Sequence, residues 1–164
     1  MFRIRADYTE QFELQANIEK ARAFFSELKN FAELMPCIES IKTDARGIVR
    51  WVIRAEVPTI GALREAFTVE LTDDSPYRVE FTPARTETKN YLRYAASFIE
   101  ASATTTLIKI SQHIELRRPT AKDLHTLAGL IGENRISAEM QKRVNDMIET
   151  FLHRARIKLE GEKK

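Results

Sequence analysis

The histidines and the cysteine are the residues of this sequence whose side chains most readily bind metals. The chain has three histidines, His113, His125 and His153, and no two of them have a spacing typical of metal ligands. The single cysteine, Cys37, excludes an intramolecular disulfide; its place after a helix end and Pro36 would suit a reactive thiol, but a small buried side chain is the usual role of a lone cysteine and is favoured. The sequence therefore predicts no metal site and, since it lacks a glycine-rich phosphate loop, no cofactor.

Carboxylates are the remaining candidates for acid–base catalysis, which requires a group within hydrogen-bond reach of the substrate. Most of them stand at positions predicted to face solvent: Glu56, Glu70, Glu80, Glu115 and the turn residues Asp73 and Asp74. Only Glu10 and Glu100 have positions that could face inward. We therefore assign no catalytic residue, and catalysis ranks below ligand binding.

Gln112 is a polar residue on the apolar face of a predicted strand, among Ile108, Ile110, Ile114 and Leu116. A buried amide without partners costs about 1–3 kcal/mol. We expect Gln112 either to meet a ligand oxygen, a water molecule or Tyr94, or to be an ordinary satisfied amide. Gln112 and Tyr94 are the residues predicted to orient the polar end of a ligand.

The elements that would position these residues follow from the hydrophobic period. Residues 2–14 alternate as a strand, with a bend or bulge expected at Glu10, and Asn17 is a good cap for a helix that breaks near Asn30 and stops at Pro36. Alternation of period two then recurs in short segments from about residue 40 to residue 116, with polar turns such as 73–76 between them.

Helical signals return after the last strand. The pattern Thr120-x-x-Asp123 resembles a capping box and predicts an amphipathic helix of about three turns that ends at Gly132. A longer helix is predicted to begin at Ser137, with an apolar stripe that continues to Leu159. The fold class is therefore α+β: a curved antiparallel sheet of about seven strands around a long C-terminal helix, with two short helices after the first strand.

Size and charge set further limits. The chain of 164 residues is interpreted as one domain spanning positions 1–164, and 26 basic against 24 acidic residues give a net charge of only +2. This balance argues against nucleic acid as a partner. No apolar run is long enough for a transmembrane segment and no secretory signal is evident, so a cytoplasmic location is expected.

The stretch "NIEKARAFFSELKNFAELMPCIESIK" and the order of elements resemble the START-related helix-grip superfamily, which includes pollen allergens and polyketide cyclase-like proteins. The resemblance covers nearly the whole chain. Small bacterial proteins of the carbon monoxide dehydrogenase G-subunit type are the nearest, although they often carry Pro-Gly where this chain has Pro36-Cys37; "LAGLIG" (127–132) is similar to a segment of theirs. The resemblance implies a cavity between sheet and helix.

Three hypotheses follow. The favoured one is binding or transport of a hydrophobic small molecule, such as a lipid, quinone or polyketide-like compound; the others are a cyclase- or hydrolase-like enzyme in the same cavity, and a regulatory module with a protein partner or a homodimer. The predicted cavity-lining residues, which could equally fill an ordinary core, are Trp51, Ile53, Phe67, Val69, Phe81, Tyr94, Phe98, Ile110, Gln112, Met140, Val144, Met147 and Phe151.

Overall fold

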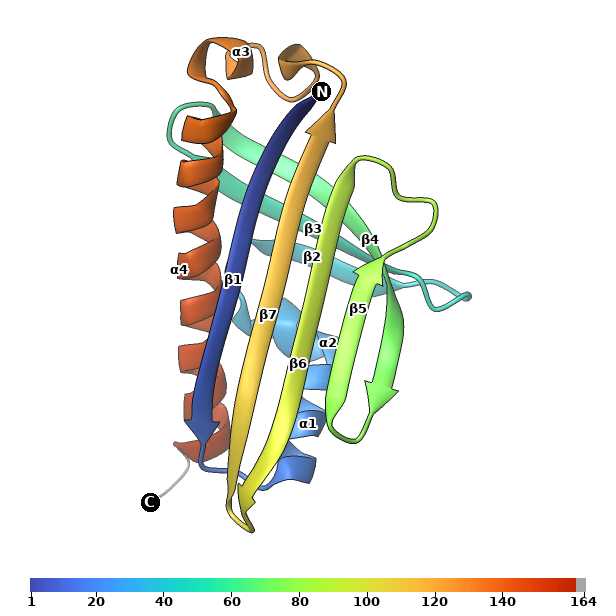
Figure 1. The fold of residues 1–164 in the computed structure, drawn as a ribbon, viewed down its shortest axis with the longest axis vertical. Helices are drawn as coiled ribbons and strands as arrows, with labels where there is room; N and C mark the ends of the chain where they lie inside the picture. Colours follow the sequence, from blue (N-terminus) through green and yellow to red (C-terminus); the bar gives the residue numbers. More distant parts are fainter. Residues whose placement is uncertain (162–164) are drawn as a thin grey trace.

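A computed structural model describes residues 1–161 of the chain and shows one curved antiparallel sheet of seven strands in the order β1-β7-β6-β5-β4-β3-β2 (Figure 1). The strands are β1 (Phe2–Leu14), β2 (Ile38–Thr43), β3 (Val49–Val57), β4 (Gly61–Ser75), β5 (Arg78–Pro83), β6 (Asn90–Ser102) and β7 (Thr105–Arg118). The helices are α1 (Ile18–Ser26), α2 (Leu28–Leu34), the 3₁₀ turn η1 (Ala121–Asp123), α3 (Ala128–Ile131) and α4 (Glu133–Glu160). The predicted fold class is confirmed.

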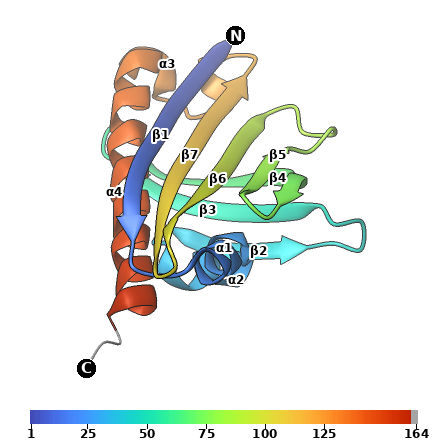
Figure 2. The same cartoon turned by 60° about the horizontal axis from the view of Figure 1, so that its bottom comes forward.

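Helix α4 runs along β1 and closes one edge of the sheet, as Figures 1 and 2 show. The edge of β1 that faces away from β7 would otherwise leave backbone groups unpaired. Side chains of α4 bind several of them: the Arg5 amide donates to Ser137 Oγ (3.1 Å), and the Asp7 amide donates to Gln141 Oε1 (2.9 Å). Near the other end of the helix, Arg156 donates to the Glu13 carbonyl (3.1 Å). The helix therefore covers both the concave face and an open edge.

The two short helices follow from local signals. Asn17 caps α1 by accepting a hydrogen bond from the Lys20 amide (2.8 Å), as predicted. Glu27 ends α1 and begins α2, so the break lies three residues before the predicted Asn30. Cys37, directly after Pro36, has a φ of 72°, a left-handed conformation that glycine adopts more easily.

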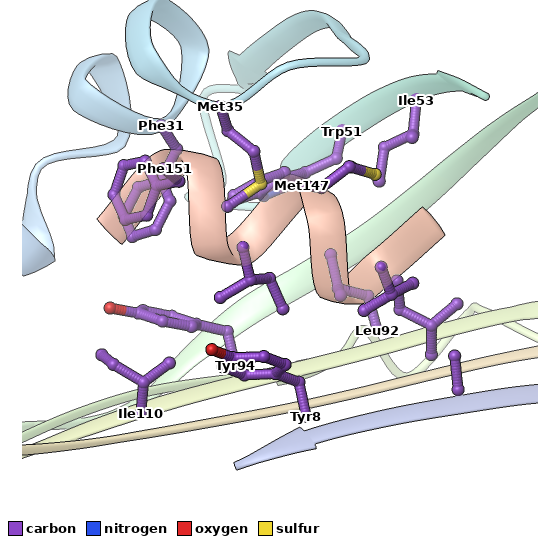
Figure 3. Close-up of a cluster of buried hydrophobic side chains, with 14 of the residues drawn as sticks. Tyr8, Phe31, Met35, Trp51, Ile53, Leu92, Tyr94, Ile110, Met147 and Phe151 are labelled. Carbon is purple, nitrogen blue, oxygen red and sulfur yellow. The ribbon is translucent and has the colours of Figure 1, made fainter. Parts of the chain in front are cut away.

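An aromatic cluster fills the half of the interior beneath α1 and α2 (Figure 3). The rings of Phe31 and Phe151 stack with their centroids 4.6 Å apart, and Phe31 also meets Tyr94 edge-on at 5.0 Å. Phe25 packs against Phe98 at 6.2 Å. Because such contacts leave little free space, this half of the interior is a packed core.

Several details of the predicted elements are wrong. Strand β1 pairs with β7 in unbroken register from Phe2 to Leu14, so no bulge exists at Glu10; its half-buried carboxylate instead accepts a hydrogen bond from the Tyr8 hydroxyl (3.0 Å). The segment 73–75 belongs to β4 rather than to a turn, and a bulge between Leu71 and Asp73 leaves Leu71 exposed.

The predicted three-turn helix over 120–132 is also wrong. The Thr120–Asp123 capping box is present, but it opens only η1, and α3 is a separate single turn. Two glycines within 129–132 weaken helix propagation, and the His125 ring accepts the Leu127 amide hydrogen between the two elements (3.0 Å). Helix α4 begins at Glu133 rather than Ser137, because Gly132 turns the chain at a φ of 90°.

Candidate functional site: an apolar recess with an anchored carboxylate

The half of the interior away from the aromatic cluster contains a recess between β3, β4, β7 and α4. Its cavity volume is only about 40 Å³, and the empty space reaches about 430 Å³ when the part that opens to solvent is included. Three partly exposed residues, Ala55, Glu65 and Arg143, mark its open side. The complete lining is Ile53, Ala55, Val57, Leu63, Glu65, Phe67, Ile114, Leu116, Met140, Arg143, Val144 and Met147.

The wall of the recess is almost entirely hydrocarbon. Apart from Glu65 and Arg143, every lining residue is aliphatic, aromatic or methionine. Strands β3 and β4 contribute one side through alternate inward residues, and α4 contributes the other through residues one turn apart, Met140, Val144 and Met147. Methionine side chains suit a wall that adjusts to its contents, because they are unbranched and flexible.

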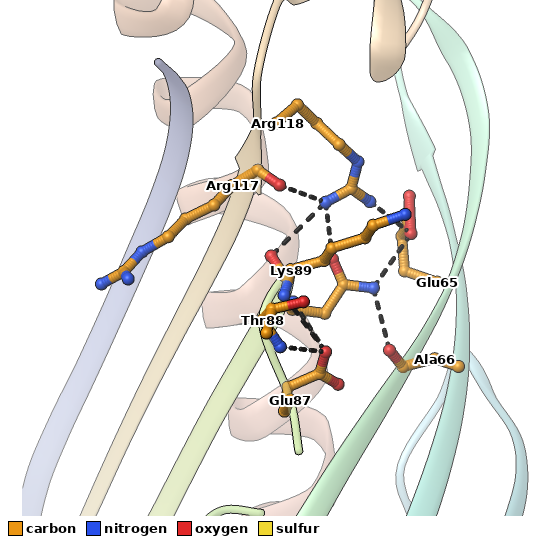
Figure 4. A network of polar contacts seen from close by, with 8 residues as sticks. Glu65, Ala66, Glu87, Thr88, Lys89, Arg117 and Arg118 are labelled. Carbon is orange, nitrogen blue, oxygen red and sulfur yellow. Dashed lines mark hydrogen bonds and ion pairs between the residues drawn. The ribbon is translucent and has the colours of Figure 1, made fainter. Parts of the chain in front are cut away.

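Glu65 is the carboxylate of this recess, and a buried arginine holds it in place (Figure 4). Arg118 Nη2 donates to Glu65 Oε1 at 2.7 Å, and the Arg118 side chain is only 8% exposed. Asn90 Nδ2 donates to the same oxygen at 3.1 Å. Both hydrogen bonds reach Oε1, which leaves Oε2 as the oxygen that can meet a ligand.

The arginine and the asparagine are themselves fully engaged. Arg118 Nη1 donates to Asn90 Oδ1 (2.9 Å) and to the backbone carbonyl of Arg117 (2.8 Å). Asn90 Nδ2 also donates to the Ala66 carbonyl (2.8 Å). The cluster of Glu65, Asn90 and Arg118 therefore joins β4, β6 and β7, and it fixes the orientation of the one carboxylate on the recess wall.

The predicted cavity residues all lie in the interior of the sheet, but they divide into two groups. Five of them line the recess: Ile53, Phe67, Met140, Val144 and Met147. The other eight are buried in the surrounding core: Trp51, Val69, Phe81, Tyr94, Phe98, Ile110, Gln112 and Phe151. Contact of any of them with a ligand stays a prediction.

Tyr94 and Gln112 do not face the recess. The Tyr94 hydroxyl donates to the Phe25 carbonyl of α1 at 3.0 Å, and complete burial raises the pKa of this phenol. Gln112 lies opposite Tyr8 and Tyr94 in the sheet, and its side-chain amide makes no hydrogen bond to another residue of the described range 1–161. Tyr94 therefore positions α1, and of the alternatives considered for Gln112 a hydrogen bond with the Tyr94 hydroxyl is not formed.

Glu65 was missed by sequence reasoning, although a signal was present. It shares its strand parity with Phe67 and Val69, which face inward, and Leu63 continues the same row. The alternation predicted for this strand begins at Phe67, after a connection predicted over 58–62, so residues 63–66 lie outside both predictions. Of the two acids proposed to face inward, Glu100 is exposed and Glu10 lies away from the recess on β1.

Other kinds of site were also sought within residues 1–161. In that range no three histidine, cysteine or acidic side chains come close enough together to hold a metal ion. The helices of the same range include none that is both long and apolar enough to cross a membrane.

Comparison with solved structures identifies the fold. An aromatase/cyclase from Streptomyces sp. R1128 superposes with a TM-score of 0.64 at 10% identity, over 96% of this chain and 98% of that one. A protein of Thermus thermophilus gives 0.60 at 18% identity (90% and 95% covered), and a START superfamily protein of Mycobacterium smegmatis gives 0.51 at 13% identity (85% and 97% covered). The chain has the START-related helix-grip fold.

The helix-grip likeness is one of structure. No protein-family model matches the sequence, and no curated protein matches it either. At identities of 10–18% the superposition establishes the architecture and not the ligand or the reaction. What the recess between the sheet and α4 of this helix-grip chain could bind is therefore inferred from the residues that line it.

Proposed function

We propose that this helix-grip protein binds an apolar small molecule in the recess between β3, β4, β7 and α4. The observation that carries the proposal is an apolar space inside an otherwise close-packed interior. Protein cores contain few voids larger than a water molecule, and apolar recesses with a few placed polar groups are the usual form of ligand sites. The walls, with two flexible methionines and one anchored carboxylate, have that composition.

The polar end of the ligand would face Glu65. Arg118 and Asn90 occupy Oε1, so a hydroxyl or amine of the ligand can donate to Oε2. A negatively charged group of the ligand would be repelled by the carboxylate there. The proposed ligand is therefore an apolar body with a hydrogen-bond donor at its outer end.

The enclosed part of the recess, about 40 Å³, holds only part of a bicyclic probe, and the rest of the probe would occupy the open mouth. The apolar area buried in both parts sets an upper limit to the affinity. A bicyclic ligand of the size of a tryptophan side chain buries about 200 Å². At about 25 cal/mol per Å² this burial is worth at most roughly 5 kcal/mol, equivalent to a dissociation constant of about 0.2 mM. Such binding is weak but saturable, and larger ligands that move the methionine side chains would bind more tightly.

Two variants of the same hairpin test the proposal. Ala55, on β3, lines the recess. Ala62 is on β4, which pairs with β3, but its side chain is exposed, so it serves as the control position. Ala55→Phe should lower the affinity for a bicyclic probe such as 2-naphthol at least tenfold, and Ala62→Phe should leave it unchanged, as measured by NMR titration. Equal binding by the two variants would exclude the recess as the site. Native mass spectrometry followed by organic extraction would identify a co-purified ligand.

Glu65 also supports a second candidate function, a cyclase-like enzyme. An inward-facing acid held by a buried arginine is a group that could exchange a proton with a bound substrate. The fold is shared with an aromatase/cyclase, and this likeness makes the candidate worth testing. Glu65→Gln would then abolish turnover of a co-purified compound while its binding remains, whereas a pure carrier would show no turnover in either form.

A further inference from the structure

Trp51 carries a buried polar atom that the fold does not satisfy. Its side chain is 3% exposed, and its indole Nε1–H has no hydrogen-bond acceptor among residues 1–161. A buried tryptophan usually finds a partner for this group, because leaving it unpaired costs about 1–3 kcal/mol. It is the one fully buried side-chain nitrogen or oxygen of the described chain that lacks a partner. A phenylalanine would fill much of the same space without that cost.

The indole lies next to the inner end of the recess. Trp51 is on β3, two residues before Ile53, and is paired across the sheet with Phe67; both of these neighbours line the recess. Figure 3 shows the Met35 and Met147 side chains beside Trp51, and Met147 is itself a wall residue. Met147 therefore belongs to the recess wall and also lies beside the ring that carries the unpaired donor.

A buried water molecule is a poor partner for this donor. A water molecule held inside a protein needs two to four polar partners. The side chains around the indole, those of Phe31, Met35, Ile53 and Met147, offer only the weak thioether acceptors of the two methionines, and neither sulfur accepts a hydrogen bond from the indole. An acceptor that brings its own apolar body is a better match to these surroundings.

We propose that the ligand of the recess carries an uncharged acceptor oxygen, such as a ketone, quinone or ether oxygen, at its inner end. Trp51 Nε1–H donates to that oxygen when the Met147 side chain moves aside. The inference rests on the proposed function and narrows it: the ligand has an apolar body, a donor facing Glu65 and a neutral acceptor facing Trp51. A charged oxygen is disfavoured because the apolar surroundings would desolvate it without a counter-charge.

A matched pair of probes tests the inference. 1-Tetralone and tetralin have the same bicyclic carbon skeleton and differ by one carbonyl group. Trp51 is the sole tryptophan, so a ¹⁵N–¹H spectrum of the wild-type protein contains a single indole signal. That signal should move downfield when 1-tetralone is added, as formation of a hydrogen bond requires, and it should not do so with tetralin.

The affinities provide a second readout. Tetralin partitions into apolar sites more readily than 1-tetralone in any protein. The role of Trp51 is therefore measured by comparing the ratio of the two dissociation constants between the wild type and Trp51→Phe. The preference for 1-tetralone relative to tetralin should fall about tenfold in Trp51→Phe, the equivalent of about 1.4 kcal/mol. The wild-type indole shift keeps the test decisive if this variant folds poorly.

The outcomes separate the two proposals. If both probes bind the wild-type protein, the indole signal does not shift downfield with the ketone, and the ratio is the same in Trp51→Phe, the role of Trp51 is refuted while ligand binding stands. If neither probe moves the methyl signals of Met147 and Ile53, the recess does not bind apolar molecules of this size, and both proposals fall. A ketone-specific shift together with a reduced ratio supports both.

Discussion

Arg118 offers the sharpest test of how the candidate site is built. Replacing it by methionine keeps the apolar stem and removes the guanidinium, which is 8% exposed at the side chain and donates to Glu65, Asn90 and two backbone carbonyls. Removing one member of a buried ion pair costs about 3–5 kcal/mol. The Glu65 side chain is 21% exposed and keeps its bond from Asn90, so water can compensate in part, and we expect a loss of about 2–3 kcal/mol.

Urea denaturation measures this loss directly, and a thermal melt should show a fall in Tm of about 5–10 °C for a chain of this length. Arg93→Met is the matched control. Arg93 pairs with Glu80 at 3.6 Å, but its side chain is 59% exposed, and exposed pairs contribute about 0–1 kcal/mol.

The double variant Glu65→Gln/Arg118→Met adds a test of the pairing itself. Once Arg118 is gone, neutralising Glu65 should cost little or should recover stability, because no unpaired charge remains. If Arg118→Met lies within about 0.5 kcal/mol of the Arg93→Met control, the cluster does not anchor Glu65, and the carboxylate is free to move.

Three further predictions concern the scaffold. Tyr94→Phe should cost about 1–2 kcal/mol in urea denaturation, because it leaves a buried backbone carbonyl of α1 without its donor. Gly132→Ala should lower the free energy of unfolding by about 1 kcal/mol, because the backbone φ is 90° there. Gly129→Ala, in α3, should be neutral or stabilising, because the added Cβ would meet its nearest neighbour at an ordinary 3.5 Å. Similar effects of the two substitutions would refute the conformational explanation. Burial opposes ionisation of Glu115, but the Arg117 and Arg5 guanidinium groups outweigh it and hold the Glu115 pKa below its ordinary 4.5. The contribution of Glu115 to the free energy of unfolding is therefore present above about pH 5 and is lost on acidification. Between about pH 5 and 3 the Glu115→Gln variant should lose less stability than the wild type. Parallel curves of stability against pH for the two proteins would contradict this.

The parts of the fold that the sequence predicted are those with local causes. Asn17 caps α1 through a hydrogen bond three residues away, and Pro36 stops α2 by geometry alone. The apolar stripe of α4 recurs over so many turns that no other element fits it. In each case the energy that decides the structure lies within a few residues of the signal.

The elements that were predicted wrongly depend on distant strand partners or on local competitors of a helix. Glu10 looked like a break in β1, but the continuous pairing with β7 carries the strand through it. The separation of η1 from α3 depends on the His125 ring and on two glycines that weaken a helix without forbidding it. Glu65 reads as a surface acid until Arg118 and Asn90, from two other strands, are seen to surround it.

The recess itself was beyond sequence reasoning, because a cavity and a core have the same apolar pattern. What separates them is the volume of the side chains that face one another. Along α4 the buried residues change from Phe151, stacked on Phe31, to Val144, which lines the recess together with Ala55. Rings packed against rings close the first half, whereas the second half, which has no such ring stack, keeps a small space. That gradient becomes visible only once the register of β3 and β4 has set these residues against the helix, and it places the unpaired Trp51 donor at the boundary between the two halves.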